Sequence, residues 1–219
     1  MDFEKLNQIN KEISQCKYIS EEYHPCSRDI SSKPLFMIPI LTQKLLLISR
    51  DPSNIANSNN TLIGFNNTFF RNHVLSSFFR NYNKGTAKAD EIYFENFSEK
   101  FYKLVYWTHY SKCYPGKNEN GHKPAKSDCS KLYLKREIEA VSPDYIILMG
   151  KDAIEFITKD SLINSISKNE NNFFKINNIN IPFICLTHPG NSNKGSKNNP
   201  RYKFKETVEQ IQIIMEEYL

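Results

Sequence analysis

The stretch "PDYIILMGKDAIEFI", residues 143–157, contains a continuous apolar run that ends in glycine and is followed by a helical pattern. An apolar run without polar alternation is typical of a strand buried on both faces, as in the interior of a parallel sheet. Similar runs occur at residues 45–48, at residues 103–109 and in "PFICLTHPG", residues 182–190. The stretch therefore predicts an architecture in which buried strands alternate with helices.

Four such strands predict a three-layer α/β/α sandwich with a short, mainly parallel, four-stranded sheet and right-handed crossovers. Between the first two strands, apolar residues at positions 69, 70, 74, 75, 78 and 79 have the spacing of an amphipathic helix. Residues 130–141 and 201–219 are also predicted to be helical. With 219 residues, 39% of them hydrophobic, the chain is expected to form a single domain over residues 1–219.

The composition favours some environments over others. No run approaches the length of a membrane span and the N-terminus does not resemble a signal peptide, so we expect a cytoplasmic monomer, or a nuclear one in a cell with a nucleus. Five cysteines in such a chain are better explained as metal ligands or buried small side chains than as disulfides. Cys185, inside an apolar run, is expected to be a core thiol. The net charge of +5 fits a polyanionic partner without requiring one.

Polar residues follow three of the predicted strands: "SRDPS" the first, "WTHYSKC" the second and "THPG" the last. In parallel α/β sheets, ligands bind beyond the carboxyl ends of the strands. We therefore expect these segments to form the functional site. A further polar segment of fifteen residues separates Cys113 from Cys129, and something other than apolar burial has to hold it in place.

These segments, in this order, resemble the uracil-DNA glycosylase superfamily, in particular its iron–sulfur branch. The likeness is carried by "VYWTHYSKCYP", "DCSKLYLKREI" and "PDYIILMGKDAIEFI". In that branch four cysteines hold a [4Fe–4S] cluster, which implies that a cluster here is bound by Cys16, Cys26, Cys113 and Cys129. The first pair departs from the family pattern, because nine residues separate Cys16 from Cys26 instead of two. A loop held by ordinary contacts, or by zinc, is the alternative.

The resemblance also implies a set of catalytic residues. Hydrolysis of the bond between base and sugar develops a cationic sugar and an anionic base, and each charge needs a partner. Asp51, in "SRDPS", would position water and stabilise the sugar, His188 would face the base oxygen, and Ser49 and Arg50 would contact the substrate. The alternative for Asp51 is a turn or a helix cap, since Asp-Pro is a common turn pair.

Two further positions concern the base. Phe65 lies where the family places a stacking aromatic residue, although core packing is the simpler explanation. His109 stands where the iron–sulfur branch has an asparagine that reads uracil, and an imidazole arranges donors and acceptors differently. Three explanations stay open: another base is recognised, uracil is read in another way, or activity has been lost.

The prediction is thus a DNA glycosylase that hydrolyses the N-glycosidic bond of uracil or another deaminated base in DNA, as in base excision repair. DNA with an extruded base would be the partner, and Lys194, Lys197 and Arg201 would contact its phosphates. For those charges a solvated loop is the alternative. For the protein, it is a non-catalytic member of the same fold that binds nucleic acid or protein.

Overall fold

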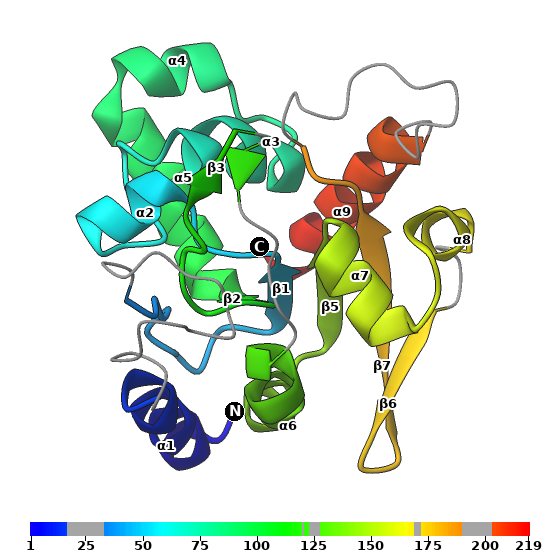
Figure 1. Cartoon of the computed structure of the whole chain (residues 1–219). Coiled ribbons are helices and arrows are strands. Elements are labelled where there is room, and N and C mark those ends of the chain that lie inside the picture. Colours follow the sequence, from blue (N-terminus) through cyan, green and yellow to red (C-terminus); the bar gives the residue numbers. More distant parts are fainter. Residues whose placement is uncertain (17–32, 120, 123–127, 169–171, 190–202) are drawn as a thin grey trace.

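A central sheet, with the strand order β2-β1-β5-β7-β6, organises the chain (Figure 1). The computed structural model describes residues 1–16, 33–119, 121–122, 128–168, 172–189 and 203–219. Strands β1, β2, β5 and β7 pair in parallel, whereas β6 is antiparallel to β7. The strands are β1 (Leu45–Ser49), β2 (Val105–His109), β5 (Tyr145–Met149), β6 (Phe173–Ile176) and β7 (Ile179–Leu186).

The interior strands owe their position to their uninterrupted apolar sequences. Every residue of β1 and β2 is buried, and so is β5 from Ile146 onward. A strand of this kind has no polar face to offer to water, so helices must cover both of its sides. The mainly parallel sheet predicted from the sequence is confirmed.

Helices form the two outer layers. On one side α5 contacts β2, α9 contacts β7, and α3 packs against both helices; on the other, α7 and α8 cover β1, β5 and β7, and α1 packs on α6 (Figure 1). In the described residues, no helix is both long and apolar enough to cross a bilayer. The α-helices are α1 (Phe3–Ser14), α2 (Asn54–Asn59), α3 (Leu75–Phe78), α4 (Lys84–Ala89), α5 (Glu91–Leu104), α6 (Lys135–Val141), α7 (Lys151–Thr158), α8 (Leu162–Ser167) and α9 (Phe204–Tyr218). Two π-helical segments, η2 (Phe70–Val74) and η3 (Ser130–Leu134), and the short hairpin of β3 (Lys117–Asn118) and β4 (Gly121–His122) complete the description.

The prediction of four strands is wrong by one, because β6 adds a fifth strand to the described sheet. This strand joins β7 through Asn177 and Asn178, which both have positive φ, 45° and 65°, as the favoured two-residue hairpin turns require. As an edge strand it is largely open to solvent, and Phe173 is 55% exposed. Its sequence therefore lacks the buried run that identified the other four strands. The second strand also begins later than predicted, at Val105, because the preceding residues end α5.

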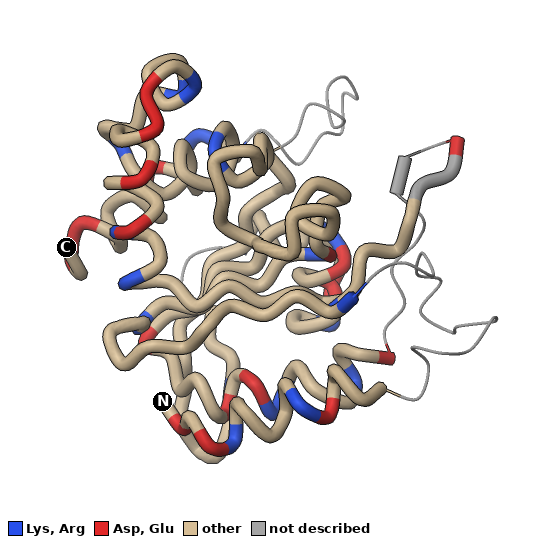
Figure 2. The backbone as a smooth tube through the Cα atoms, turned by 90° about the vertical axis from the view of Figure 1, so that its left-hand side faces the viewer, with Lys and Arg blue, Asp and Glu red and all other residues tan. Residues whose placement is uncertain are grey.

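The first helix packs on α6 through apolar and charged contacts. Its apolar side chains Leu6, Ile9 and Ile13 are buried, and Arg136 of α6 makes two contacts with Glu12, of 2.6 and 3.0 Å. Figure 2 shows charged residues of both signs along this pair of helices, below the sheet. Because α1 ends at Ser14, this packing fixes the place at which Cys16 leaves the helix.

Candidate functional site

The carboxyl ends of β1 and β2 lie side by side. Ser49, the last residue of β1, is in register with His109, the last residue of β2. Beyond the strands the pairing continues, because the Tyr110 amide donates to the Ser49 carbonyl at 2.7 Å and the Ser111 amide to the Arg50 carbonyl at 2.8 Å. The first two polar segments singled out in the sequence therefore run together at one edge of the sheet.

The third segment reaches the same edge through β5 and β7. Met149 pairs with Leu186, and the Gly150 amide donates to the Leu186 carbonyl at 2.9 Å. Gly150 has a φ of 88°, which favours glycine, and a Cβ added there would lie 3.9 Å from the His188 Cβ. His188 therefore lies close to the turn that starts α7.

Arg50 links two carboxylates at this edge. Its Nε lies 3.1 Å from Asp51 Oδ1 and 3.3 Å from Asp152 Oδ2, and Asp152 is in the first turn of α7. The Asp51 side chain is only 2% exposed, whereas that of Asp152 is 37% exposed. Burial raises the pKa of Asp152, Arg50 opposes this rise, and the charge of Asp51 adds to it. One guanidinium is thus shared by two carboxyl groups. Burial of Asp152 and the negative charge of Asp51 both favour the protonated form of Asp152.

The helix-cap alternative for Asp51 does not apply to α2. The N-cap of α2 is Ser53, whose side-chain oxygen accepts the Ala56 amide at 3.0 Å. Asp51 precedes that cap by two residues and forms an ion pair with Arg50.

His109 is a buried, neutral imidazole. The residue is 1% exposed, and its Nδ1 has no hydrogen-bond partner in the described part of the chain. Burial lowers the pKa of His109 well below 6.5, and the nearby Lys112 cation lowers it further. The Trp107 ring lies 5.3 Å from it, and Trp107 Nε1 donates to Ser49 Oγ at 2.8 Å. A neutral imidazole offers one donor and one acceptor, so an uncharged base edge is a suitable partner for it.

A buried ion pair lies near His109, where the chain turns after β2. Lys112 and Glu137 are each 1% exposed and contact one another, and both also bond to the Thr108 hydroxyl, at 2.7 and 3.1 Å. Glu137 belongs to α6, so this network joins the turn after β2 to the helix that follows the cysteine loop.

His188 is half-buried, and its ring stacks on Phe69 with centroids 4.9 Å apart and planes inclined by 19°. Phe69 directly precedes the π-helical segment η2. The Thr187 hydroxyl, next to His188, is buried and has no hydrogen-bond partner among the described residues.

Phe65 is a half-buried ring held from two sides. Phe94 meets it edge-on at 5.5 Å, and the Arg71 guanidinium lies 4.8 Å from its centroid. Arg71 Nη1 also donates to the Phe65 carbonyl at 2.9 Å. The ring is therefore well fixed, and it touches the hydrophobic core while keeping part of its surface open.

The cysteines fall into two groups, the predicted cluster ligands and the core thiol Cys185. Burial raises the pKa of the Tyr133 hydroxyl, and Cys16 and Cys129 add to this rise. Cys26 lies outside the described residues, and within them no three His, Cys, Asp or Glu side chains come close enough together to bind a metal ion. The described cysteines alone therefore do not make a cluster site. Cys185 is fully buried, and burial raises the pKa of its thiol to about 12, as suits a core residue.

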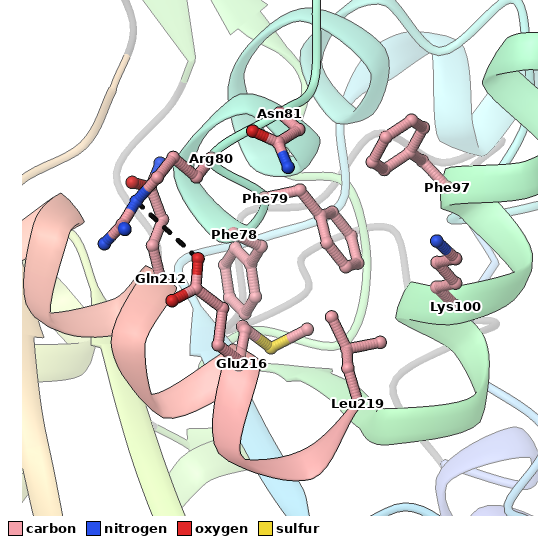
Figure 3. A pocket seen from close by; sticks show the side chains of 10 residues that line it. Phe78, Phe79, Arg80, Asn81, Phe97, Lys100, Gln212, Glu216 and Leu219 are labelled. Carbon is pink, nitrogen blue, oxygen red and sulfur yellow. Dashed lines mark ion pairs between the residues drawn. The ribbon is translucent and has the colours of Figure 1, made fainter.

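The residues predicted to contact DNA phosphates lie outside the part of the chain that the structure describes, and a pocket of the structure is separate from the candidate site. Lys194, Lys197 and Arg201 are outside the described residues. A pocket of about 120 Å³ lies between α3, α5 and α9, with Phe78, Phe79 and Met215 on its walls and the Arg80–Glu216 ion pair, at 3.6 Å, on its rim (Figure 3). None of the residues predicted for the site lines this pocket.

Sequence reasoning missed two residues at the sheet edge. Asp152 follows a strand end that the topological rule had already marked as ligand-binding, so the signal was present but was applied only to the other three strands. Phe69 has the spacing of a core residue in an amphipathic helix, and no sequence signal distinguishes it from its buried neighbour Phe70.

Residues 37–212 match the family model described as the uracil DNA glycosylase superfamily. The match covers all three strand-end segments and the helices between them. A comparison with curated proteins found no match.

Proposed function

From the premise that the chain belongs to the uracil DNA glycosylase superfamily, we propose that it hydrolyses the N-glycosidic bond of uracil or another deaminated base in DNA. Family membership implies DNA binding and a glycosylase-like function. The observation that supports the finer proposal is the position of Asp51, His109 and His188 at the carboxyl ends of β1, β2 and β7, which are parallel strands of one sheet. An acid, a neutral hydrogen-bonding ring and a second imidazole at one edge suit the chemistry of glycosidic bond cleavage.

In the proposed reaction, a water oxygen attacks the anomeric carbon of the sugar while the bond to the base nitrogen breaks. The electron pair of that bond leaves with the base, and the sugar passes through a cationic state. Asp51 would orient the water, accept its proton and stabilise the cation, since a buried carboxylate acts strongly at short range. His188 would donate a hydrogen bond to the oxygen of the departing base.

Recognition of the base is assigned to His109 and Phe65. His109 presents an unpartnered Nδ1 on a neutral ring, which suits hydrogen bonding to an uncharged base edge. Phe65 would provide the flat surface on which an extruded base lies, because Arg71 and Phe94 already hold its ring in place. Ser49 and Arg50 would support these groups from the end of β1.

A non-catalytic role is the second candidate, and one observation favours it. The Asp51 carboxylate is 2% exposed and paired with Arg50, so it is not open to water in this structure. In that case the protein would bind DNA or a protein partner without cleaving a base.

The decisive experiment is an excision assay on oligonucleotides carrying uracil, hypoxanthine or xanthine. The parent protein is expected to release at least one of these bases, and Asp51→Asn to slow the release by about a hundredfold or more. Glu99→Gln is the matched control, because this carboxylate is exposed on α5 and pairs with a neighbouring lysine, Lys103. Binding of DNA by a parent protein that releases none of the three bases would select the non-catalytic role.

We also propose that Cys16, Cys26, Cys113 and Cys129 hold a [4Fe–4S] cluster that orders the polar loop. Thiolates are the ligands that such clusters prefer, and Cys113 and Cys129 stand at the two ends of the polar loop that a cluster would order. No step of the proposed reaction passes through the cluster. Protein purified without oxygen is expected to be brown and to contain iron, and colourless, iron-free protein would refute the cluster.

A further inference from the structure

The helical stretch over residues 68–78 has two distinct faces. Phe70, Val74 and Phe78 are fully buried in the core, whereas Phe69 and His73 are half-buried on another face. The central part of the stretch is the π-helical segment η2, which inserts an extra residue into the helix and shifts the register of its side chains. Such segments are frequent at functional sites.

The face that carries Phe69 is turned toward the end of β7. The Phe69 ring lies nearly parallel to the His188 imidazole, at 4.9 Å and 19°, and His73 adds a third ring at 5.8 Å and 39° from Phe69. These separations are within the range of favourable aromatic contacts. His73 follows Phe69 by four residues, so the helix itself brings those two rings together.

Something other than covalent geometry has to set the plane of the His188 ring. The terminal side-chain torsion of a histidine is broad, and Pro189 restricts the backbone of His188 but not this torsion. Gly150 approaches the His188 side chain from the turn before α7, and it has no side chain with which to hold the ring. Phe69 supplies a flat surface against it.

We propose that Phe69 is a positioning residue that fixes the plane of the His188 imidazole and hence the directions of its two ring nitrogens. The proposal rests on the role assigned to His188 above. Phe69 does not touch the reacting atoms. It acts by keeping His188 oriented, and a donor held in place before the reaction spends no free energy in finding its direction.

The test compares Phe69→Leu with Phe69→Tyr and with Phe97→Leu. Leucine keeps apolar volume but removes the flat ring, whereas tyrosine keeps it. Phe97 is the matched control, because it is also a half-buried phenylalanine in ring contacts, with Phe79 at 5.3 Å, but it lies on α5 and lines the pocket of Figure 3.

Two measurements are needed. The first is the nuclear Overhauser contact between the His188 ring protons, assigned by their loss in His188→Gln, and Gly150, which lies beside this side chain; Phe69→Leu should weaken the contact, because the imidazole can then turn about its last torsion. The second is single-turnover excision, which Phe69→Leu should slow by about tenfold to a hundredfold while the dissociation constant for DNA stays within about twofold of the parent. Phe69→Tyr should restore both properties, and Phe97→Leu should leave both unchanged.

An unchanged contact between His188 and Gly150 in Phe69→Leu would overturn the proposal, as would a weakened contact with unchanged excision. Equal losses in Phe69→Leu and Phe97→Leu would also overturn it, because they would indicate a general loss of stability. A parent protein that cleaves no base would refute the proposed reaction instead. The NMR comparison would then decide alone whether Phe69 orients the ring.

Discussion

His109 is buried, neutral and lacks a hydrogen-bond partner for its Nδ1 among the described residues. A buried polar atom without a partner costs free energy, and a ligand that satisfies it recovers that cost. The sequence already marked this position through its place at a strand end. Its burial and neutrality come from Trp107, from Lys112 and from the depth of β2 in the sheet, which no local pattern records.

Replacing His109 by asparagine should increase excision of uracil relative to the parent. An amide both donates and accepts at its tip, and sites that match the hydrogen bonds of one base reject another by several kcal/mol. The measurement is single-turnover release of uracil from an oligonucleotide, with hypoxanthine as the comparison. If the parent releases uracil well and His109→Asn loses that activity, then His109 is itself the uracil reader and the prediction is wrong.

The same residue should make stability depend on pH. The pKa of His109 is lower in the folded chain than its unfolded value of about 6.5, so below that pH the unfolded state binds a proton that the folded state does not. The contribution of the neutral His109 ring to the free energy of unfolding is therefore fully present above about pH 6.5. It should fall by about 1.4 kcal/mol for each pH unit below that, until the folded-state pKa is reached.

Urea unfolding at several pH values checks this expectation. His109→Asn should lack this part of the slope, and comparison with the parent cancels the contributions of all other groups. Parallel stability curves for the two proteins between pH 4 and pH 7, a range of about three units around the ordinary histidine pKa, would contradict the prediction.

At the scale of elements, the Lys112–Glu137 pair connects the turn after β2 with α6. Both side chains are buried, and the Thr108 hydroxyl completes the network. Because Lys112 precedes Cys113 by one residue, the pair also anchors the start of the polar loop between Cys113 and Cys129. Part of what holds that loop is therefore a buried ion pair, a contact that the sequence did not predict.

Glu137→Gln should destabilise the protein by about 3–5 kcal/mol, because it leaves the buried Lys112 charge without a counter-ion. The double variant Lys112→Met/Glu137→Leu should recover most of that loss, since an apolar pair of similar volume carries no desolvation cost. Urea unfolding of Lys112→Met, of Glu137→Leu and of the double variant gives the coupling free energy. A double variant as unstable as the sum of the singles would show that the two residues do not act together.

Elements differ in how far the sequence predicted them. The interior strands were found because a strand covered on both faces needs an unbroken apolar run, which is a local signal. β6 was missed because an edge strand carries no such run. The helix at residues 68–78 was found, but its π-helical segment was not. Phe69, which stacks on His188, directly precedes that segment, and no local sequence signal marks either feature.

At the scale of the whole molecule, parallel pairing explains why the candidate site could be located from the sequence. Residues as far apart as Asp51 and His188 follow strands of one sheet, and the carboxyl ends of parallel strands lie at one edge. Topology therefore fixes where the three strand-end segments lie, whereas the directions of their side chains depend on contacts such as Arg50 with Asp152. Those contacts had no counterpart in the motifs.

The last prediction concerns the charge of the molecule and its partner. If Lys194 and Lys197, in the loop after His188, contact phosphates, binding to duplex DNA should weaken as salt rises, because counter-ions are released from the duplex. Lys194→Ala/Lys197→Ala should reduce the slope of log affinity against log salt by about 1.8, or about 0.9 for each phosphate that the protein no longer neutralises.

The matched control is Lys11→Ala/Lys44→Ala, which removes the same charge from α1 and from the amino end of β1, away from the carboxyl edge. Its slope should equal that of the parent. Equal slopes for all three proteins would place the DNA surface elsewhere, whereas equal reductions in both double variants would show that net charge, and not this loop, governs binding.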